Sequence, residues 1–341
     1  MKTVSRVISA AVLLALTAGI ITFAKSSPVI FFLWYPAFSQ WLLGLLGDIT
    51  AKVGFTVWEV AALALTVWAV VSLIRSIKKG KILRWLAGLL WGVSLGVFAF
   101  TLLWGAGHFG PAKTEQVVTV RDFSARELSA ATEYFAQKAS ETVPQDKGDF
   151  VSLSPLAMDG YAVLSQSYDT FPELSVTVKP LLSSKLMSRM GTTGIFVPMT
   201  AETCVNTDCY PSAMAYTMCH EIAHRMGANR EDDANFCAFL ACVNHPDARY
   251  RYSGWYSAFL YCYNALAEMD GNLAAQAWDA LSPAVQEDIR ATNAHYAQYD
   301  GEVQEAAQTV NDAYLEFFGQ DGTESYGQVA NALVAWYQRF A

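Results

Sequence analysis

The sequence has little charge of either sign. Only 16% of its 341 residues are Asp, Glu, Lys or Arg, whereas 53% are apolar. Acidic residues are nearly absent from residues 1–104, which hold nine Lys and Arg against two Asp and Glu, a net charge of +7. The remainder holds fourteen basic and twenty-nine acidic residues, a net charge of −15. This acidic part lacks the basic surface that phosphate groups require, which argues against nucleic acid as a partner.

Cysteine is absent from the first 203 residues, and histidine occurs only five times in the chain. All six cysteines therefore lie in the acidic part, and an even number of them is typical of an oxidising compartment. Cys204 and Cys209 enclose a short loop, and we expect these two to form a disulfide. The other four are expected to be buried thiols.

Three apolar segments, at about 7–24, 55–74 and 83–104, are long enough to cross a membrane. The most basic loop of the chain separates the second segment from the third, and the positive-inside rule places this loop in the cytoplasm. Three spans with a cytoplasmic N-terminus satisfy this rule, whereas four would not. A cleavable signal peptide is the alternative for the first segment.

Residues 28–47 are also apolar, but they are rich in aromatic residues and interrupted by Pro36. This pattern favours a segment that lies in the membrane interface. The sequence thus predicts a membrane domain over 1–104, a linker over 105–125 and an extracytoplasmic domain over 126–341.

The sequence His220-Glu221-Ile222-Ala223-His224 carries the strongest chemical signal. Residues four apart share one face of a helix, so both imidazoles can reach the same Zn²⁺ ion. Glu221 can then act as general base toward a water that the metal activates. The alternative is a core helix with two ordinary histidines, which would leave Glu221 as a costly charge among apolar residues.

A catalytic zinc site needs a third protein ligand, and Glu231 is the nearest candidate. Gly227 can end the first helix in a left-handed conformation, and an acidic, amphipathic stretch from Glu231 to Val243 predicts a second helix. We expect Asn235, one turn further on, to hold a histidine or the turn. Two neighbouring carboxylates are the alternative ligands: Asp232 and Asp233.

The stretches HEIAHRMG and EDDANFCAFLAC resemble an uncharacterised family of bacterial membrane proteins, domain of unknown function 3810, which is regarded as zincin-like. The resemblance covers most of the chain and includes the runs GIFVPMTAE, RYSGW and GTESYGQV. It implies a mostly helical, α+β zincin-like domain behind the three membrane helices. The ExxAN element is also similar to that of zinc peptidases that cleave phage and stress-response repressors, which supports Glu231 as a ligand. Arg230 stands where metzincins place a third histidine, which argues against their arrangement.

The resemblance also implies that Gly194–Val197 is an edge strand beside the site, where unpaired backbone groups can hold an extended peptide; a purely structural strand is the alternative. Tyr252 and His245 are candidate donors to the oxyanion of a tetrahedral intermediate.

We therefore expect a zinc metallopeptidase, with one Zn²⁺ per chain, that is anchored in the lipid bilayer and cleaves peptides or proteins on the outer face of the cell membrane. Two alternatives stay open at this point. One is a membrane-tethered binding or sensory module with a structural zinc ion, and the other is a zinc hydrolase of a non-peptide amide of the cell envelope.

Overall fold

The computed structural model describes residues 2–318 and 325–341, and it divides the chain into two compact units. The first unit comprises residues 1–110 together with 197–202, and the second comprises 111–196 and 203–341. Helices account for 72% of the structure, which confirms the predicted mostly helical class. The short segment 197–202 belongs to the first unit although it lies far along the chain from the rest of it.

The first unit consists mainly of helices: α1 (Lys2–Ser26), α2 (Pro28–Phe32), α3 (Tyr35–Thr50), α4 (Val57–Lys78), α5 (Ile82–Leu103) and η1 (Gly105–Phe109). Four stretches of the described residues are long and apolar enough to cross a membrane, one more than the sequence predicted. The additional one is Pro28–Thr50, which covers the segment expected in the interface. No residue of α4 is buried in the protein, as is typical of a helix whose apolar side chains face lipid.

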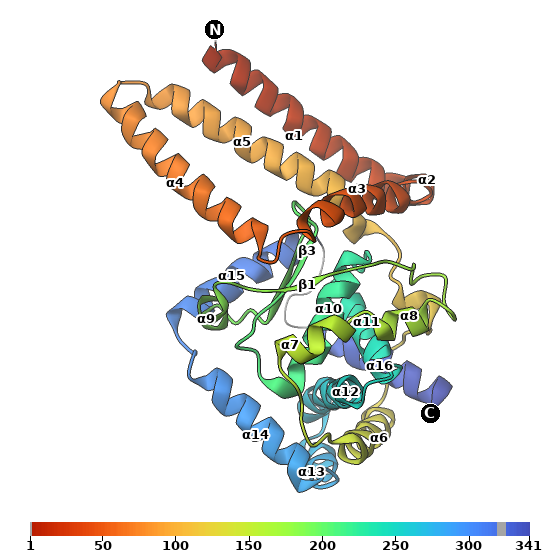
Figure 1. Cartoon of the computed structure of the whole chain (residues 1–341). Helices are drawn as coiled ribbons and strands as arrows, with labels where there is room; N and C mark the ends of the chain where they lie inside the picture. The colour runs from red at the N-terminus through yellow and green to blue at the C-terminus, as the bar shows by residue number, and fades with distance from the viewer. Residues whose placement is uncertain (1, 319–324) are drawn as a thin grey trace. The chain divides into compact units, whose positions relative to one another are not determined.

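Within this unit, α1 runs beside α5, and α4 turns back into α5 (Figure 1). Arg6 donates from Nη1 to the carbonyl oxygen of Arg84 at 3.3 Å, so both helices begin at the same end. The indole of Trp85 donates to Ser72 Oγ at 2.8 Å, which ties the start of α5 to the last third of α4. α1 and α5 are therefore parallel, and α4 is antiparallel to α5.

The second unit begins with η2 (Thr114–Gln116), α6 (Ala125–Thr142), α7 (Phe150–Leu153), η3 (Ser154–Leu156) and α8 (Asp159–Leu164). It continues through α9 (Ser184–Arg189), α10 (Pro211–Arg225), α11 (Glu231–Val243), α12 (Ala248–Met269) and α13 (Gly271–Asp279). The last helices are α14 (Pro283–Ala297), α15 (Glu302–Phe317) and α16 (Ser325–Phe340). The core forms where α10, α11 and α12 pack on one another and on α6.

A small sheet has the order β1-β3-β2, with β1 (Val178–Pro180) parallel to β3 (Glu202–Val205). β2 (Gly194–Val197), the strand predicted from the sequence, is at one edge of this sheet. The turn that joins β2 to β3 falls in the segment 197–202 that belongs to the first unit.

The predicted disulfide between Cys204 and Cys209 is not formed. All six cysteines are free and buried. Cys204 lies in β3, whereas Cys209 lies in the turn before α10. The Cys209 thiol instead accepts a hydrogen bond from the Tyr296 hydroxyl at 3.3 Å and lies 3.8 Å from the Thr217 hydroxyl. The prediction of buried thiols at the other four cysteines is confirmed.

Candidate metal centre

Two histidines of α10 present their rings to the same point. His220 and His224 are one helical turn apart, and their ring centroids are separated by 4.6 Å. The helix ends immediately afterwards, where Gly227 takes a φ of 92° that only glycine adopts easily. The amide of Ala228 then donates to the carbonyl oxygen of Ala223 at 3.0 Å, and this turn redirects the chain toward α11.

Glu231 is the first residue of α11 and faces both histidines, as the sequence predicted. Its Oε2 lies 3.3 Å from His220 Nε2, and its Oε1 lies 3.4 Å from His224 Nε2. One ligand atom from each residue lies within 4.8 Å of the other two. We call these three residues the ligand cluster.

The spacing of the ligand cluster fits a divalent cation. Two ligands at 2.0–2.1 Å from a tetrahedral zinc ion are about 3.3 Å apart, which matches both nitrogen–oxygen distances. The same distances are long for an N–H···O hydrogen bond, so without an ion the carboxylate makes only long hydrogen bonds to the two imidazoles. His224 Nδ1 lies 2.7 Å from the carbonyl oxygen of Ala228 and donates to it, which turns Nε2 of the same ring toward Glu231.

Charge within the cluster shifts the pKa values of its members. Burial favours the neutral form of His224, but the carboxylate of Glu231 outweighs this effect and raises the pKa of His224 to about 9. Partial burial would likewise raise the pKa of Glu231, yet the two imidazoles hold it well below its usual value. In the metal-free protein a proton on His224 therefore supplies the positive charge that Glu231 requires.

Glu221 lies next to the ligand cluster and points toward β2. Its side chain is buried, and this burial raises the pKa of its carboxyl group, although the nearby histidines partly offset the effect. The backbone N–H of Phe196 donates to the carboxylate. A Cβ atom on Gly194 would lie only 2.5 Å from Glu221 Oε1, so the carboxylate fits in this position because residue 194 has no side chain.

The ligand cluster is open to solvent on one side. The side chains of His220 and His224 are 13% and 7% exposed, whereas that of Glu231 is 34% exposed. Within residues 2–318 and 325–341, the group contains three ligands and no fourth His, Cys, Asp or Glu. Three protein ligands with an accessible side are characteristic of catalytic zinc sites, because structural sites are closed by four.

Comparison with protein families assigns the chain to one family. The family model described as protein of unknown function (DUF3810) matches residues 34–334. The chain belongs to this family. Neither a curated protein nor a solved structure matches it. The match extends from α3 to α16, so the membrane-proximal helices and the ligand cluster are parts of one family architecture.

The other acidic residues of α11 have partners outside the ligand cluster. Asp232 forms an ion pair with Arg230 at 2.8 Å, and Asp233 accepts hydrogen bonds from the backbone amides of Lys113 and Thr114 at 3.0 and 2.8 Å. Neither is therefore needed as the alternative ligand that the sequence left open.

The hydrogen bonds of Asn235 go to neighbouring helices rather than to a histidine or to the turn before α11, so that expectation was wrong. Its Oδ1 accepts a hydrogen bond from the Tyr261 hydroxyl at 2.9 Å, and its carbonyl oxygen accepts one from Tyr216 at 2.8 Å. Asn235 thus fastens α11 to α10 and α12. The group that orients His224 is the carbonyl oxygen of Ala228, which a sequence pattern does not reveal because every residue carries a carbonyl.

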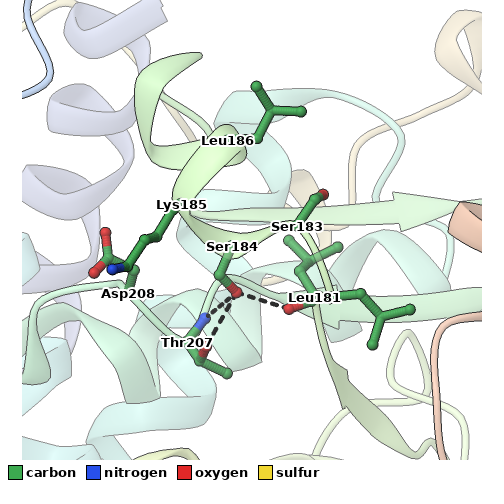
Figure 2. A pocket seen from close by; sticks show the side chains of 8 residues that line it. Leu181, Ser183, Ser184, Lys185, Leu186, Thr207 and Asp208 are labelled. Carbon is green, nitrogen blue, oxygen red and sulfur yellow. Dashed lines mark hydrogen bonds between the residues drawn. The ribbon is translucent and has the colours of Figure 1, made fainter.

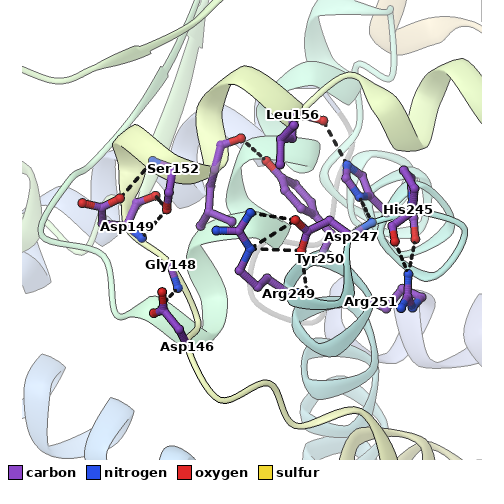
Figure 3. A network of polar contacts seen from close by, with 12 residues as sticks. Asp146, Gly148, Asp149, Ser152, Leu156, His245, Asp247, Arg249, Tyr250 and Arg251 are labelled. Carbon is purple, nitrogen blue, oxygen red and sulfur yellow. Dashed lines mark hydrogen bonds and ion pairs between the residues drawn. The ribbon is translucent and has the colours of Figure 1, made fainter.

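The two expected oxyanion donors, Tyr252 and His245, form hydrogen bonds within the folded domain. The hydroxyl of Tyr252 donates to Asp288. In Figure 3, His245 bridges the carbonyl oxygen of Leu156 and the amide of Asp247, at 2.9 Å each. These bonds join α12 and the segment before it to neighbouring elements, and they leave neither side chain available as the predicted donor.

Tyr314 is a side chain close enough to the ligand cluster to be affected by the charge of Glu231, and the sequence did not suggest it. It lies on α15, and burial together with the charge of Glu231 raises the pKa of its phenol. Its distance of 83 positions from Glu231, with no motif around it, explains why no pattern could find it.

A separate pocket of about 400 Å³ lies between α9 and the loop after β3 (Figure 2). Its polar groups bond mainly to one another: Ser184 Oγ donates to the carbonyl oxygen of Leu181 at 2.8 Å and accepts from the Thr207 amide at 3.1 Å. No member of the ligand cluster lines it.

Proposed function

We propose that the chain is a membrane-anchored zinc-dependent peptidase that acts on the outer face of the cell membrane and has a zincin-like catalytic domain. The observation that carries this proposal is the ligand cluster, in which Glu231 lies 3.3 and 3.4 Å from the two imidazole nitrogens and a buried glutamate stands beside the three residues. The family match carries no activity with it, so the proposal depends on this geometry.

His220, His224 and Glu231 would hold the ion. A zinc ion held by them would supply a Lewis acid, which lowers the pKa of a bound water and polarises a carbonyl group. The Ala228 carbonyl keeps His224 in the tautomer whose Nε2 can coordinate.

Glu221 would act as general base. It takes the proton of the attacking water and later delivers it to the leaving amine. In the metal-free protein, burial raises the pKa of the Glu221 carboxyl group, which makes it a better proton acceptor. The Phe196 amide keeps the carboxylate aligned along β2.

A closed structural zinc site, the main alternative, would need a fourth protein ligand. Among residues 2–318 and 325–341 the cluster has three potential ligands and no fourth, and this count together with the 34% exposure of the Glu231 side chain favours the catalytic interpretation. The same geometry would also suit hydrolysis of a non-peptide amide of the cell envelope, and digestion experiments distinguish the two substrate classes.

The experiment is metal analysis and peptide-library digestion with the detergent-purified full chain and its Glu221→Gln variant. We expect about one zinc ion in both proteins and a loss of turnover of about 10²–10⁴-fold in the variant. Glu141→Gln, a substitution at an exposed residue of α6, is the matched control and should keep both properties. Undiminished cleavage by Glu221→Gln would remove Glu221 as the base, and no cleavage by the wild-type protein would remove the peptidase.

A further inference from the structure

The two ends of α3 both contact the same end of the first unit. At its N-terminal end, the Tyr35 hydroxyl donates to the carbonyl oxygen of Thr101 at 3.4 Å, and the Ser39 hydroxyl donates to that of Leu103. Leu103 is the last residue of α5. The N-terminal half of α3 is therefore fixed to the C-terminal end of α5.

The C-terminal end of α3 lies beside the start of α4. Thr50 is the last residue of α3, and its hydroxyl donates to the carbonyl oxygen of Thr200 at 3.1 Å. Two residues further on, the buried carboxylate of Glu202 accepts the backbone N–H groups of Val57 and Trp58 at 2.7 and 2.8 Å. The segment 197–202 thus ties the end of α3 to the first turn of α4.

The start of α4 and the end of α5 lie at the same end of the helical hairpin, because these two helices are antiparallel. The opposite end carries the basic loop and the beginning of α1, where Arg6 contacts Arg84. The C-terminal end of α1 returns to the α3 side, where the Lys25 ammonium lies 4.6 Å from the ring centre of Phe109. Both termini of α3 are thus on the side away from the basic loop, and Figure 1 shows α3 crossing the direction of the long helices.

The length of α3 agrees with this placement. Its 16 residues extend about 24 Å, whereas the 22 residues of α4 extend about 33 Å, and the apolar part of a bilayer is about 30 Å thick. Length and composition make Pro28–Thr50 a fourth candidate span, but a helix with both ends on one side cannot cross.

One face of α3 is buried against the rest of the first unit, and another face exposes apolar side chains. Tyr35, Ser39, Leu43 and Thr50 are buried against the rest of the unit. A stripe with apolar side chains is exposed on another face, with Trp34 44%, Trp41 60%, Leu45 47% and Ile49 64% exposed. Tryptophan is enriched where a bilayer meets water, because its ring is apolar and its N–H group is polar.

We propose that α3 lies flat in the interface between membrane and water, on the side of the membrane away from the basic loop. Its stripe of Trp34, Trp41, Leu45 and Ile49 is inserted at the boundary between the lipid headgroups and the acyl chains. The partner of this surface is the lipid bilayer itself. The bilayer covers the stripe because the three helices that α3 joins at one end are themselves long enough to cross it. This inference is independent of any zinc chemistry.

The test uses single cysteines at Ser26 and Lys52, two exposed polar positions just before and just after the stretch Pro28–Thr50 that contains α3, and at Lys79 in the basic loop as the control. The native cysteines are at most 3% exposed, so the unaltered chain gives the labelling background. The full-length variants are treated with a membrane-impermeant maleimide in right-side-out and in inverted membrane vesicles. We expect label at Ser26 and Lys52 in one orientation, and at Lys79 in the other.

Labelling of Ser26 and Lys52 from opposite sides would overturn the proposal, because it would show that the stretch containing α3 crosses the membrane. Protection of both from either side would overturn it as well, because it would place α3 inside the bilayer. Spin labels at Trp34→Cys and Ile49→Cys give a second measurement. We expect the two labels at nearly the same depth, whereas a spanning helix would separate them by about 22 Å.

Discussion

Two glutamates, one in each unit, stand at the N-terminal turn of a helix and behave differently. Glu202 is 2% exposed, and its carboxylate accepts two backbone N–H groups of α4 at 2.7 and 2.8 Å. Glu231 is 34% exposed at its side chain and faces two imidazole nitrogens at 3.3 and 3.4 Å. The first set of distances is that of good hydrogen bonds, and the second is that of ligands around an ion. The comparison separates a carboxylate that holds the fold from one that, in the proposed function, would hold the metal ion.

The largest effect is expected at the ligand cluster. Glu231→Ala should lower zinc affinity by more than about 100-fold, because loss of a direct ligand exceeds the 10–100-fold cost typical of residues that only orient ligands. Competition with a chelating dye measures this. Asp232→Ala, which removes the adjacent carboxylate but not a ligand, should keep zinc affinity; an equal loss in both variants would show that the general negative charge of this turn, rather than coordination, binds the ion.

The Gly194→Ala variant tests whether turnover depends on the position of the Glu221 carboxylate. The new Cβ atom would displace the carboxylate, so we expect turnover to fall by up to about 100-fold, as small misplacements of catalytic groups do. The free energy of unfolding should change little, because the displaced group is the end of a flexible side chain. Gly271→Ala on α13 is the control, since nothing lies within 4 Å of its new Cβ. Full turnover in Gly194→Ala would contradict the placement of the base.

The proton on His224 predicts how zinc affinity depends on pH. Because the pKa of His224 is raised from 6.5 to about 9 in the folded protein, its pairing with Glu231 stabilises the metal-free fold fully below about pH 6.5. This stabilisation is lost as the pH rises through about 9. Zinc must displace the proton, so its affinity should rise by up to about tenfold per pH unit between pH 6.5 and 9.

Calorimetry in buffers of different ionisation enthalpy would count the protons that zinc binding releases. We expect about one proton per zinc ion at pH 7.5. Binding without proton release, and with the same affinity at pH 6.5 and 8.5, would show that His224 is neutral in the metal-free protein.

The smallest effect on chemistry is expected at the other glutamate. Glu202→Ala removes the carboxylate from the start of α4 and should destabilise the first unit by about 1–2 kcal/mol, as loss of a helix N-terminal acceptor does. Zinc affinity should stay unchanged. Glu202→Gln should cost less, because its amide oxygen still accepts one of the two bonds. A loss of zinc in Glu202→Ala would break the distinction between the two carboxylates.

The sequence alone determined the apolar N-terminal helices, the mostly helical class, β2 and the three members of the ligand cluster. These features depend on hydrophobicity and on spacing along one or two adjoining helices, which local geometry fixes. A loop of three residues between Gly227 and Glu231 leaves the second helix few places other than beside the first.

Only the tertiary structure decided what depends on distant partners. The free thiols of Cys204 and Cys209, the structural bonds of Asn235, Tyr252 and His245, and the two ends of α3 are set by residues dozens to more than a hundred positions away. A polar side chain or a thiol can bond to any suitable neighbour, and packing of the whole chain selects which one it meets. Spacing therefore predicts groups that converge along a helix, but not those that converge across the core.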